Sequence, residues 1–227
     1  HIVRFKKGVL MKVETIVGGS IQTNCYIIIS GNSCSLFDFV PEVEDFIKNR
    51  KLKVENVFLT HIHFDHFENL FDFQKRYDFK LYMSQIAYKN INDKSKNLLC
   101  SIPKEFYRDV LDVKLDNAEI LYDNAVVEWK GKRIVALESP GHSEDSLVYI
   151  LPDEKIVFSG DTIFYGSIGR TDLPGSSYDD IFKSIKKLFS KISDEFMLYP
   201  GHGPFTNVEF EKKHNYFLKS GPFNIEL

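Results

Sequence analysis

The stretch Thr60-His61-Ile62-His63-Phe64-Asp65-His66 contains three histidines and one aspartate within six consecutive residues, 61–66. It comes directly after the apolar run Val57–Leu59, which is typical of a short buried strand, so the side chains gather where the backbone turns. Histidine and aspartate are ligands that Zn²⁺ and iron accept. A single tetrahedral ion uses only some of these groups, and further candidates lie downstream. The sequence therefore predicts a site for two ions.

Three later stretches each place a metal-ligating residue type after a glycine, just beyond a predicted strand. They are Gly141-His142, Gly160-Asp161 and Gly201-His202. In layered sheets, functional groups collect on the loops that leave the strands at one edge. Glycine allows the backbone to approach closely at such loops. We expect these residues to join the first cluster, whereas the isolated His1 and His214 are assigned to the surface.

Short β-branched or aromatic runs alternate along the chain with segments of helical periodicity. The predicted strands are Val13–Val17, Cys25–Ile29, Cys34–Phe39, Val57–Leu59, Phe79–Met83, Ala125–Trp129, Arg133–Leu137, Ser146–Leu151, Lys155–Ser159 and Phe196–Tyr199. The predicted helices follow Pro41, lie around Leu70, begin near Ser177 and span Glu209–Leu218. The polar stretch from about Ser84 to Asn117 is assigned to helices or a lid. Strands in hairpin-like groups that also alternate with helices indicate an α/β or α+β layered domain.

Composition limits the class of protein further. The 227 residues include 43% hydrophobic and 27% charged residues with a net charge of -3, as in a globular protein that buries a core. This charge balance argues against partners such as nucleic acid or an anionic membrane surface, and no apolar run approaches the roughly 18 residues of a membrane span. The three cysteines form no CxxC pair. We therefore expect a cytoplasmic protein with a small-molecule substrate.

With three more stretches, the chain resembles the metallo-β-lactamase superfamily and, within it, the short glyoxalase II-like hydrolases. These stretches are Asn24-Cys25-Tyr26, the segment from Ser167 to Gly175, and the segment from Tyr199 to Pro204. The resemblance runs from about Met11 to Phe217. It implies a four-layer αβ/βα sandwich with a dinuclear site at one edge. We expect residues 11–227 to form a single hydrolase domain, preceded by residues 1–10 as a native or artificial N-terminal extension.

The resemblance also implies which residues hold the metals when it is carried over position by position. The first ion would be held by His61, His63 and His142, the second by Asp65, His66 and His202, and Asp161 would bridge them. The cofactors would be two divalent ions, zinc first, with iron or manganese as alternatives. Asp65 and Asp161 are the candidate catalytic residues.

Three further residues are candidates for holding a metal ligand in position or for contacting the substrate. Asp38 either accepts a hydrogen bond from a ligand histidine or is an ordinary turn aspartate. Arg170 either clamps a substrate carboxylate or pairs within its own loop, and we favour the second. Tyr165 either lines the pocket or is simply half-buried.

The sequence departs from the family pattern beside the predicted site. Phe67-Glu68-Asn69 replaces glycines that commonly follow the metal motif, Phe39-Val40 replaces a Pro-Gly, and Ser176 replaces a glycine. These departures leave the substrate open. The chain given ends 25 residues after His202, so we expect no C-terminal helical domain of the kind that binds glutathione in longer glyoxalase II enzymes.

The chemistry of two divalent ions narrows the reaction. Such a centre lowers the pKa of bound water towards about 7, so a bridging hydroxide becomes available, and it polarises a substrate carbonyl. A thiolate leaves readily because a free thiol has a pKa near about 8.5. An amide nitrogen needs an added acid, and a phosphodiester needs extra cations. The motifs contain neither, so hydrolysis of a small thioester, as by a hydroxyacylglutathione hydrolase, fits best.

Other functions remain open at this point. A persulfide dioxygenase of the same fold uses a single iron, so metal counting separates it from a dinuclear hydrolase. A metallo-hydrolase of another ester or of a phosphodiester is a further alternative. A nuclease-like member needs a basic surface, which the balanced charge does not indicate. A non-enzymatic binding protein has no need of seven intact ligand positions.

Overall fold

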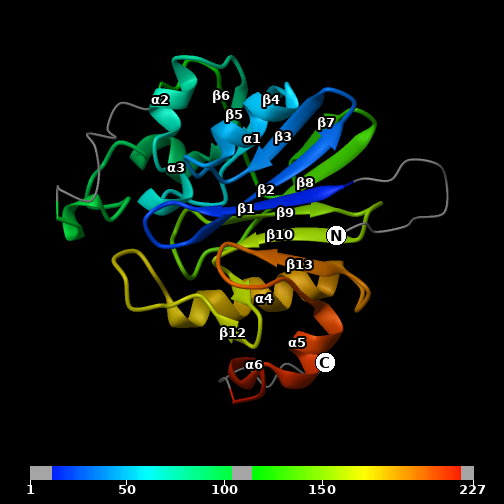
Figure 1. The fold of residues 1–227 in the computed structure, drawn as a ribbon. Coiled ribbons are helices and arrows are strands. Elements are labelled where there is room, and N and C mark those ends of the chain that lie inside the picture. The colour runs from blue at the N-terminus through cyan, green and yellow to red at the C-terminus, as the bar shows by residue number, and fades with distance from the viewer. Residues whose placement is uncertain (1–11, 104–113, 221–227) are drawn as a thin grey trace. The chain divides into compact units, whose positions relative to one another are not determined.

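The computed structural model describes residues 12–103 and 114–220 (Figure 1). The chain divides into two compact units, with the boundary between Ile120 and Leu121. Each unit is built on a six-stranded sheet of its own. The expected N-terminal extension, 1–10, lies outside the described residues, as does 104–113 in the middle of the segment assigned to helices or a lid.

The sheet of the first unit has the order β1-β2-β3-β4-β5-β6. Its strands are β1 (Val13–Gly18), β2 (Thr23–Ser30), β3 (Ser33–Phe37), β4 (Lys53–Phe58), β5 (Lys80–Ser84) and β6 (Ala118–Leu121). Strands β1, β2 and β3 pair antiparallel, whereas β3, β4 and β5 run parallel. Because parallel strands end at the same edge, the segments that leave β3 and β4 lie side by side. Consistent with this, the amide of Asp38 donates to the carbonyl of Phe58 at 2.8 Å.

Short helices accompany this first sheet. They are α1 (Val43–Arg50), α2 (Leu70–Gln74), α3 (Gln85–Asn90) and the 3₁₀ turns η1 (Phe64–His66) and η2 (Leu99–Ser101). In α1, Val43 and Ile47 lie four residues apart and are both buried in the core of this unit. The same core contains Leu36 and Val57, so it fixes the ends of the two strands from which the candidate site begins.

The sheet of the second unit has the order β14-β13-β10-β9-β8-β7. Its strands are β7 (Val126–Trp129), β8 (Lys132–Glu138), β9 (Leu147–Leu151), β10 (Ile156–Gly160), β13 (Met197–Pro200) and β14 (Thr206–Asn207), and a small hairpin adds β11 (Ile163–Phe164) and β12 (Ser167–Ile168). β10 and β13 are parallel neighbours. Lys130 and Gly131 connect β7 to β8 and both have positive φ, as a type I′ hairpin requires.

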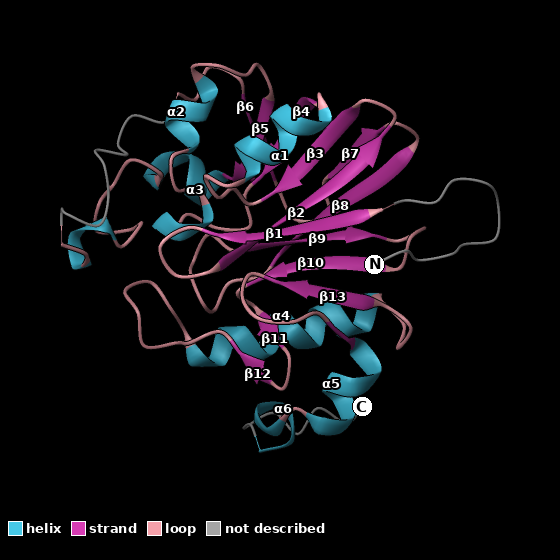
Figure 2. Cartoon of the chain, viewed as in Figure 1, coloured by secondary structure: helices cyan, strands magenta, loops and turns pink. Residues whose placement is uncertain are grey.

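Helix α4 (Tyr178–Lys191) is the 14-residue helix of the second unit (Figure 2). Its predicted start is confirmed, because the hydroxyl of Ser177 accepts a hydrogen bond from the amide of Asp180 and caps the helix. Ile181, Ile185 and Leu188 lie on one face and are buried in the core of this unit. Across the described part of the chain, no helix is both long and apolar enough to span a bilayer.

The prediction of one C-terminal helix over Glu209–Leu218 is wrong. The structure has two short helices instead, α5 (Val208–His214) and α6 (Tyr216–Ser220). Between them, Asn215 is extended with ψ 115°. Its side-chain amide donates to Glu211 Oε2 at 2.8 Å and to the carbonyl of Ser167 at 3.0 Å. These buried hydrogen bonds compensate for the interruption of the helix.

Candidate metal centre

The first unit gathers four candidate ligands in the segment that follows β4. His61, His63, Asp65 and His66 are between 0 and 4% exposed. The amide of His66 donates to the carbonyl of His63 at 3.0 Å, which closes the 3₁₀ turn η1. This tight turn brings side chains of nearly adjacent residues together on one side of the backbone.

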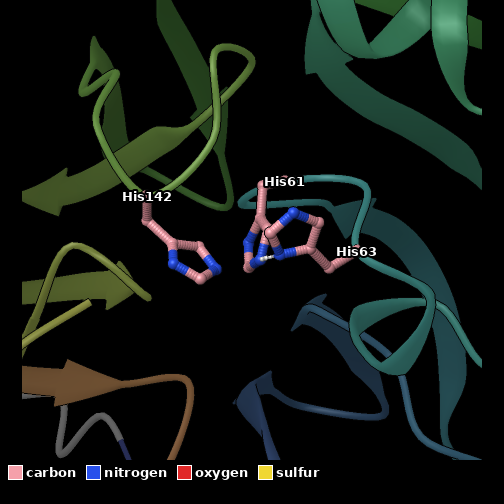
Figure 3. Close-up of side chains that lie close together, drawn as sticks. All are labelled: His61, His63 and His142. Carbon is pink, nitrogen blue, oxygen red and sulfur yellow. Dashed lines mark hydrogen bonds between the residues drawn. The ribbon is translucent and has the colours of Figure 1, made fainter. Parts of the chain in front are cut away.

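The ligand atoms of this segment approach one another closely. His61 Nε2 lies 3.1 Å from His63 Nδ1, the contact drawn as a dashed line in Figure 3. His66 Nε2 lies 3.2 Å from Asp65 Oδ2, and the rings of His61 and His66 are 4.0 Å apart between centroids. Three imidazoles and one carboxylate form a donor set that suits zinc or iron. The chemistry of these residues therefore fits a bound metal ion, and the described chain contains His and Asp groups able to hold one.

Asp38 and Thr60 orient two of these imidazoles. Asp38 Oδ2 lies 2.8 Å from His66 Nδ1, and the other oxygen accepts the backbone amide of Thr60 at 2.7 Å. The Thr60 hydroxyl lies 3.1 Å from His61 Nδ1. Because Nδ1 of each ring is engaged in this way, the Nε2 atoms of His61 and His66 face the other candidate ligand atoms. Of the two interpretations left open for Asp38, the contact with a candidate ligand histidine is the one that the structure contains.

Thr23 is a site residue that the sequence analysis missed. Its hydroxyl donates to Asp65 Oδ2 at 2.6 Å, and the side chain is fully buried at the start of β2. The adjoining Asn24-Cys25-Tyr26 was among the stretches that carry the family resemblance. Proximity to that stretch was therefore the available signal, but nothing in the local sequence connects Thr23 to a carboxylate 42 residues away.

The second unit carries the other three candidate ligands on loops that follow its strands. Asp161 follows β10 and His202 follows the parallel neighbour β13, while His142, labelled in Figure 3, follows β8. His142 Nε2 lies 3.4 Å from Asp161 Oδ2, and His202 Nε2 lies 3.7 Å from the same oxygen. The ring nitrogens of two imidazoles thus lie near the same carboxylate oxygen. His142 Nδ1 lies 3.0 Å from the carbonyl of Arg170, which fixes the orientation of this ring.

Glycines make room for these loops. A Cβ on Gly169 would lie 1.9 Å from the backbone oxygen of Asp161 and 3.0 Å from His142 Cβ. Gly141 has φ +148°, and a Cβ there would lie 2.4 Å from the backbone of Ile181 in α4. Only glycine fits at such close approaches. Gly169 therefore reflects crowding beside Asp161 and His142, and Gly141, which precedes His142, reflects crowding against α4.

The side chains of Arg170 and Tyr165 contact residues other than the candidate ligands. The Arg170 guanidinium makes a bidentate pair with Asp172, at 2.7 and 2.8 Å, and this hydrogen bonding holds the pKa of the Asp172 carboxyl below its ordinary value. Tyr165 is 52% exposed and stacks on Phe210 with ring centroids 4.7 Å apart. Arg170 contributes to the site through its backbone carbonyl, the acceptor that faces His142.

Comparison with known proteins now identifies the family. The model of the metallo-beta-lactamase superfamily matches residues 18–202. The chain belongs to this superfamily. It is 31% identical over 217 residues to a probable metallo-hydrolase, YqgX of Bacillus subtilis, covering 92% of this chain and 98% of the relative. It is 28% identical over 217 residues to hydroxyacylglutathione hydrolase GloC of Haemophilus influenzae, covering 92% and 99% respectively.

Solved structures of the superfamily share the fold. BLEG-1 B3 metallo-beta-lactamase superposes with a TM-score of 0.82 at 27% identity, covering 92% of this chain and 100% of that one. TTHA1623, in a di-iron-bound form, superposes with a TM-score of 0.75 at 27% identity, covering 91% and 100%. The predicted superfamily, its glyoxalase II-like likeness and the metallo-β-lactamase fold class are confirmed. The chain is a superfamily member with His and Asp groups able to bind metal.

Proposed function

We propose that this chain is a metal-dependent hydrolase of a small thioester and that residues 11–227 act as one catalytic domain. Two divalent ions, zinc first and iron or manganese as alternatives, would be held by His61, His63, Asp65, His66, His142, Asp161 and His202. When bound, the ions supply an activated water and polarise the substrate carbonyl. The observation that carries the proposal is the buried set of three imidazoles and one carboxylate after β4, with ring nitrogens already engaged by Asp38 and Thr60.

The chain's own residues prepare the ligands for this task. Asp38 accepts the Nδ1 proton of His66, and the Arg170 carbonyl accepts the Nδ1 proton of His142, so that both Nε2 atoms carry the lone pair. The carboxylates of Asp65 and Asp161 offset the positive charge of the cations. Since these hydrogen bonds exist within each unit, the ligands need little reorganisation to bind metal.

The thioester assignment depends on the leaving group. A thiolate departs without a proton, whereas a phosphodiester needs cations around its oxygens. The guanidinium of Arg170, in the loop whose carbonyl faces His142, is paired with Asp172. The printed name of GloC, hydroxyacylglutathione hydrolase, supports the same class of substrate. The TTHA1623 structure, described as di-iron-bound, supports two ions per chain. The free thiols of Cys25, Cys34 and Cys100 support a reducing, cytoplasmic location.

His63→Ala and Asp161→Asn test the proposal. We expect the native chain to bind two metal ions and to hydrolyse S-lactoylglutathione, and each variant to lose metal and at least about 100-fold in kcat/KM, since even outer-shell changes cost about 10- to 100-fold. Elemental analysis and a thiol-release assay measure both quantities. His214→Ala is the control, because His214 is an exposed histidine on α5.

Two outcomes would contradict the proposal. Full turnover with a normal metal content in either variant would reject the ligand roles. A single iron per chain, with oxygen consumed and a persulfide as the substrate, would replace the hydrolase with the alternative dioxygenase.

A further inference from the structure

The turn between β1 and β2 is attached to the metal-ligand segment by side chains. Thr23 Oγ1 donates to Asp65 Oδ2 at 2.6 Å. Three residues earlier, the amide and hydroxyl of Ser20 both donate to Glu68 Oε2 at 2.8 Å. Two points of the turn segment thus contact two points of the segment from Asp65 to Glu68. The turn therefore has a defined position against a candidate ligand.

A second carboxylate fixes the other side of the same turn. Glu42 Oε2 accepts the amide of Gly19 at 3.0 Å. A Cβ on Gly18 would lie 1.9 Å from this oxygen and would displace the Glu42 side chain, and Gly19 has φ +69°, a backbone conformation that favours glycine. Gly18 is also the register partner of Thr23 in the β1–β2 pair. The position of Thr23 is consequently determined by the strand pairing and by two carboxylate contacts.

We infer that Thr23 is a positioning residue that sets the rotation of the Asp65 carboxylate, an inference that rests on the proposed role of Asp65 as a metal ligand. The terminal torsion of an aspartate is broad, so its oxygens have no fixed direction without a partner. A hydrogen bond of 2.6 Å from a buried hydroxyl to a carboxylate is short and charge-assisted. It selects one rotation of the group.

The selected oxygen also faces the neighbouring ligand. Asp65 Oδ2, the atom that Thr23 contacts, lies 3.2 Å from His66 Nε2. The Thr23 hydroxyl therefore sets where the carboxylate stands relative to that imidazole nitrogen. Glu68 supports this arrangement from a position where the family commonly has glycine, a residue without a side chain to hold Ser20. The departure noted in the sequence thus has a structural role in this chain.

Thr23→Val tests the inference because it removes the hydroxyl and nearly preserves the volume. We expect Thr23→Val to bind one of its two ions about 10- to 100-fold more weakly than the native chain, as is usual for the loss of a group that orients a ligand. The probe is Co²⁺, titrated against a chromogenic chelator and followed by its visible absorption spectrum, which reports the ligand geometry. Thr23→Ser keeps the hydroxyl and is expected to restore native affinity and the native spectrum.

Thr206→Val is a matched control. Thr206 is also buried, and its hydroxyl donates to Glu211 Oε1 at the same distance of 2.6 Å, but Glu211 is outside the proposed ligand set. We expect Thr206→Val to lower the midpoint of thermal unfolding while binding Co²⁺ as the native chain does. A loss of affinity confined to Thr23→Val therefore reports on Asp65 and not on stability.

The outcomes separate this inference from the proposed function. If Thr23→Val binds both ions with native affinity and an unchanged spectrum, or if Thr206→Val weakens binding equally, the positioning role is overturned while the hydrolase proposal stands. A native chain that binds no metal overturns both. If Thr23→Val does not fold, Glu68→Ala decides instead: weaker binding of one ion supports the inference, and unchanged binding overturns it.

Discussion

Two buried thiols illustrate how the position of a residue determines its reactivity. Burial, reinforced by the Asp38 carboxylate, raises the pKa of the Cys25 thiol well above its ordinary value. Burial and the carboxylate of Glu55 raise the pKa of Cys34 to about 12. The Cys25 thiol also donates to the carbonyl of Asp38 at 3.1 Å. Both groups are therefore protonated at neutral pH and serve as core residues, whereas Cys100 is exposed.

These differences predict selective alkylation. In native protein at pH 8, iodoacetamide should modify Cys100 first, because a pKa of about 12 leaves on the order of one Cys34 in ten thousand as the reactive thiolate. Because this pKa is raised, increasing the pH to 9 should still leave Cys34 unmodified. Peptide mass spectrometry after timed quenching measures each site, and denatured protein is the control in which all three cysteines react. Labelling of Cys25 or Cys34 at the rate of Cys100 in native protein would contradict this prediction.

At the scale of elements, the sequence predicts the helices and strands whose hydrophobic pattern extends over several residues. All ten predicted strands overlap strands of the structure, and α4 begins at its predicted cap. Four short strands, β6, β11, β12 and β14, were not predicted, since two to four residues are too few to show a period. The break at Asn215 was missed because one of its partners, Ser167, is 48 residues away.

The same distinction applies to the candidate site. The seven proposed ligand positions stand out because their residue types recur after glycine or within one short stretch. The residues that orient them do not stand out. Asp38 reaches Thr60 and His66 from a left-handed backbone conformation, φ 58°, and the residue pattern does not reveal that conformation. Orientation depends on tertiary contacts, which the sequence alone did not provide.

The loop after β12 offers a test of crowding at the level of an element. In Gly169→Ala the new Cβ would contact the Asp161 backbone at 1.9 Å, so the loops that carry Asp161 and His142 must shift. We expect a loss of about 1–3 kcal/mol in the free energy of unfolding together with a lower metal content. Urea titration and elemental analysis measure these quantities.

Gly131→Ala is the comparison for that experiment. Gly131 has φ +74° in the β7–β8 turn, and a Cβ there would meet nothing within 4 Å. We expect it to cost roughly 1–2 kcal/mol from backbone conformation alone and to leave the metal content unchanged. Native stability and native metal content in Gly169→Ala would show that the loops tolerate the added methyl group.

For the whole molecule, the proposed ions link catalysis to stability. A cation that binds only the folded chain stabilises it by about 2.7 kcal/mol when its free concentration is 100 times Kd. For a chain of this size, about 1 kcal/mol raises the Tm by roughly 2–4 °C. We therefore expect Zn²⁺ added to chelator-treated protein to raise the Tm by several degrees in calorimetry.

His63→Ala is the control for this linkage and should show a much smaller rise, because it lacks one proposed ligand. An identical Tm with and without metal in the native protein would count against tight binding by the folded chain. An equal rise in both proteins would show that the ion binds elsewhere.

The attachment of the β1–β2 turn also matters for protein engineering. The turn is held by Glu42 and Glu68, which lie far from it in the sequence. A graft that exchanges only residues 19–22 for those of another superfamily member would remove the Ser20 hydroxyl that donates to Glu68, and a different turn conformation would redirect the two backbone amides that donate to Glu42 and Glu68. An exchange that moves the turn and these two glutamates together conserves the contacts. Redesign of the β1–β2 turn should therefore change the turn, Glu42 and Glu68 together.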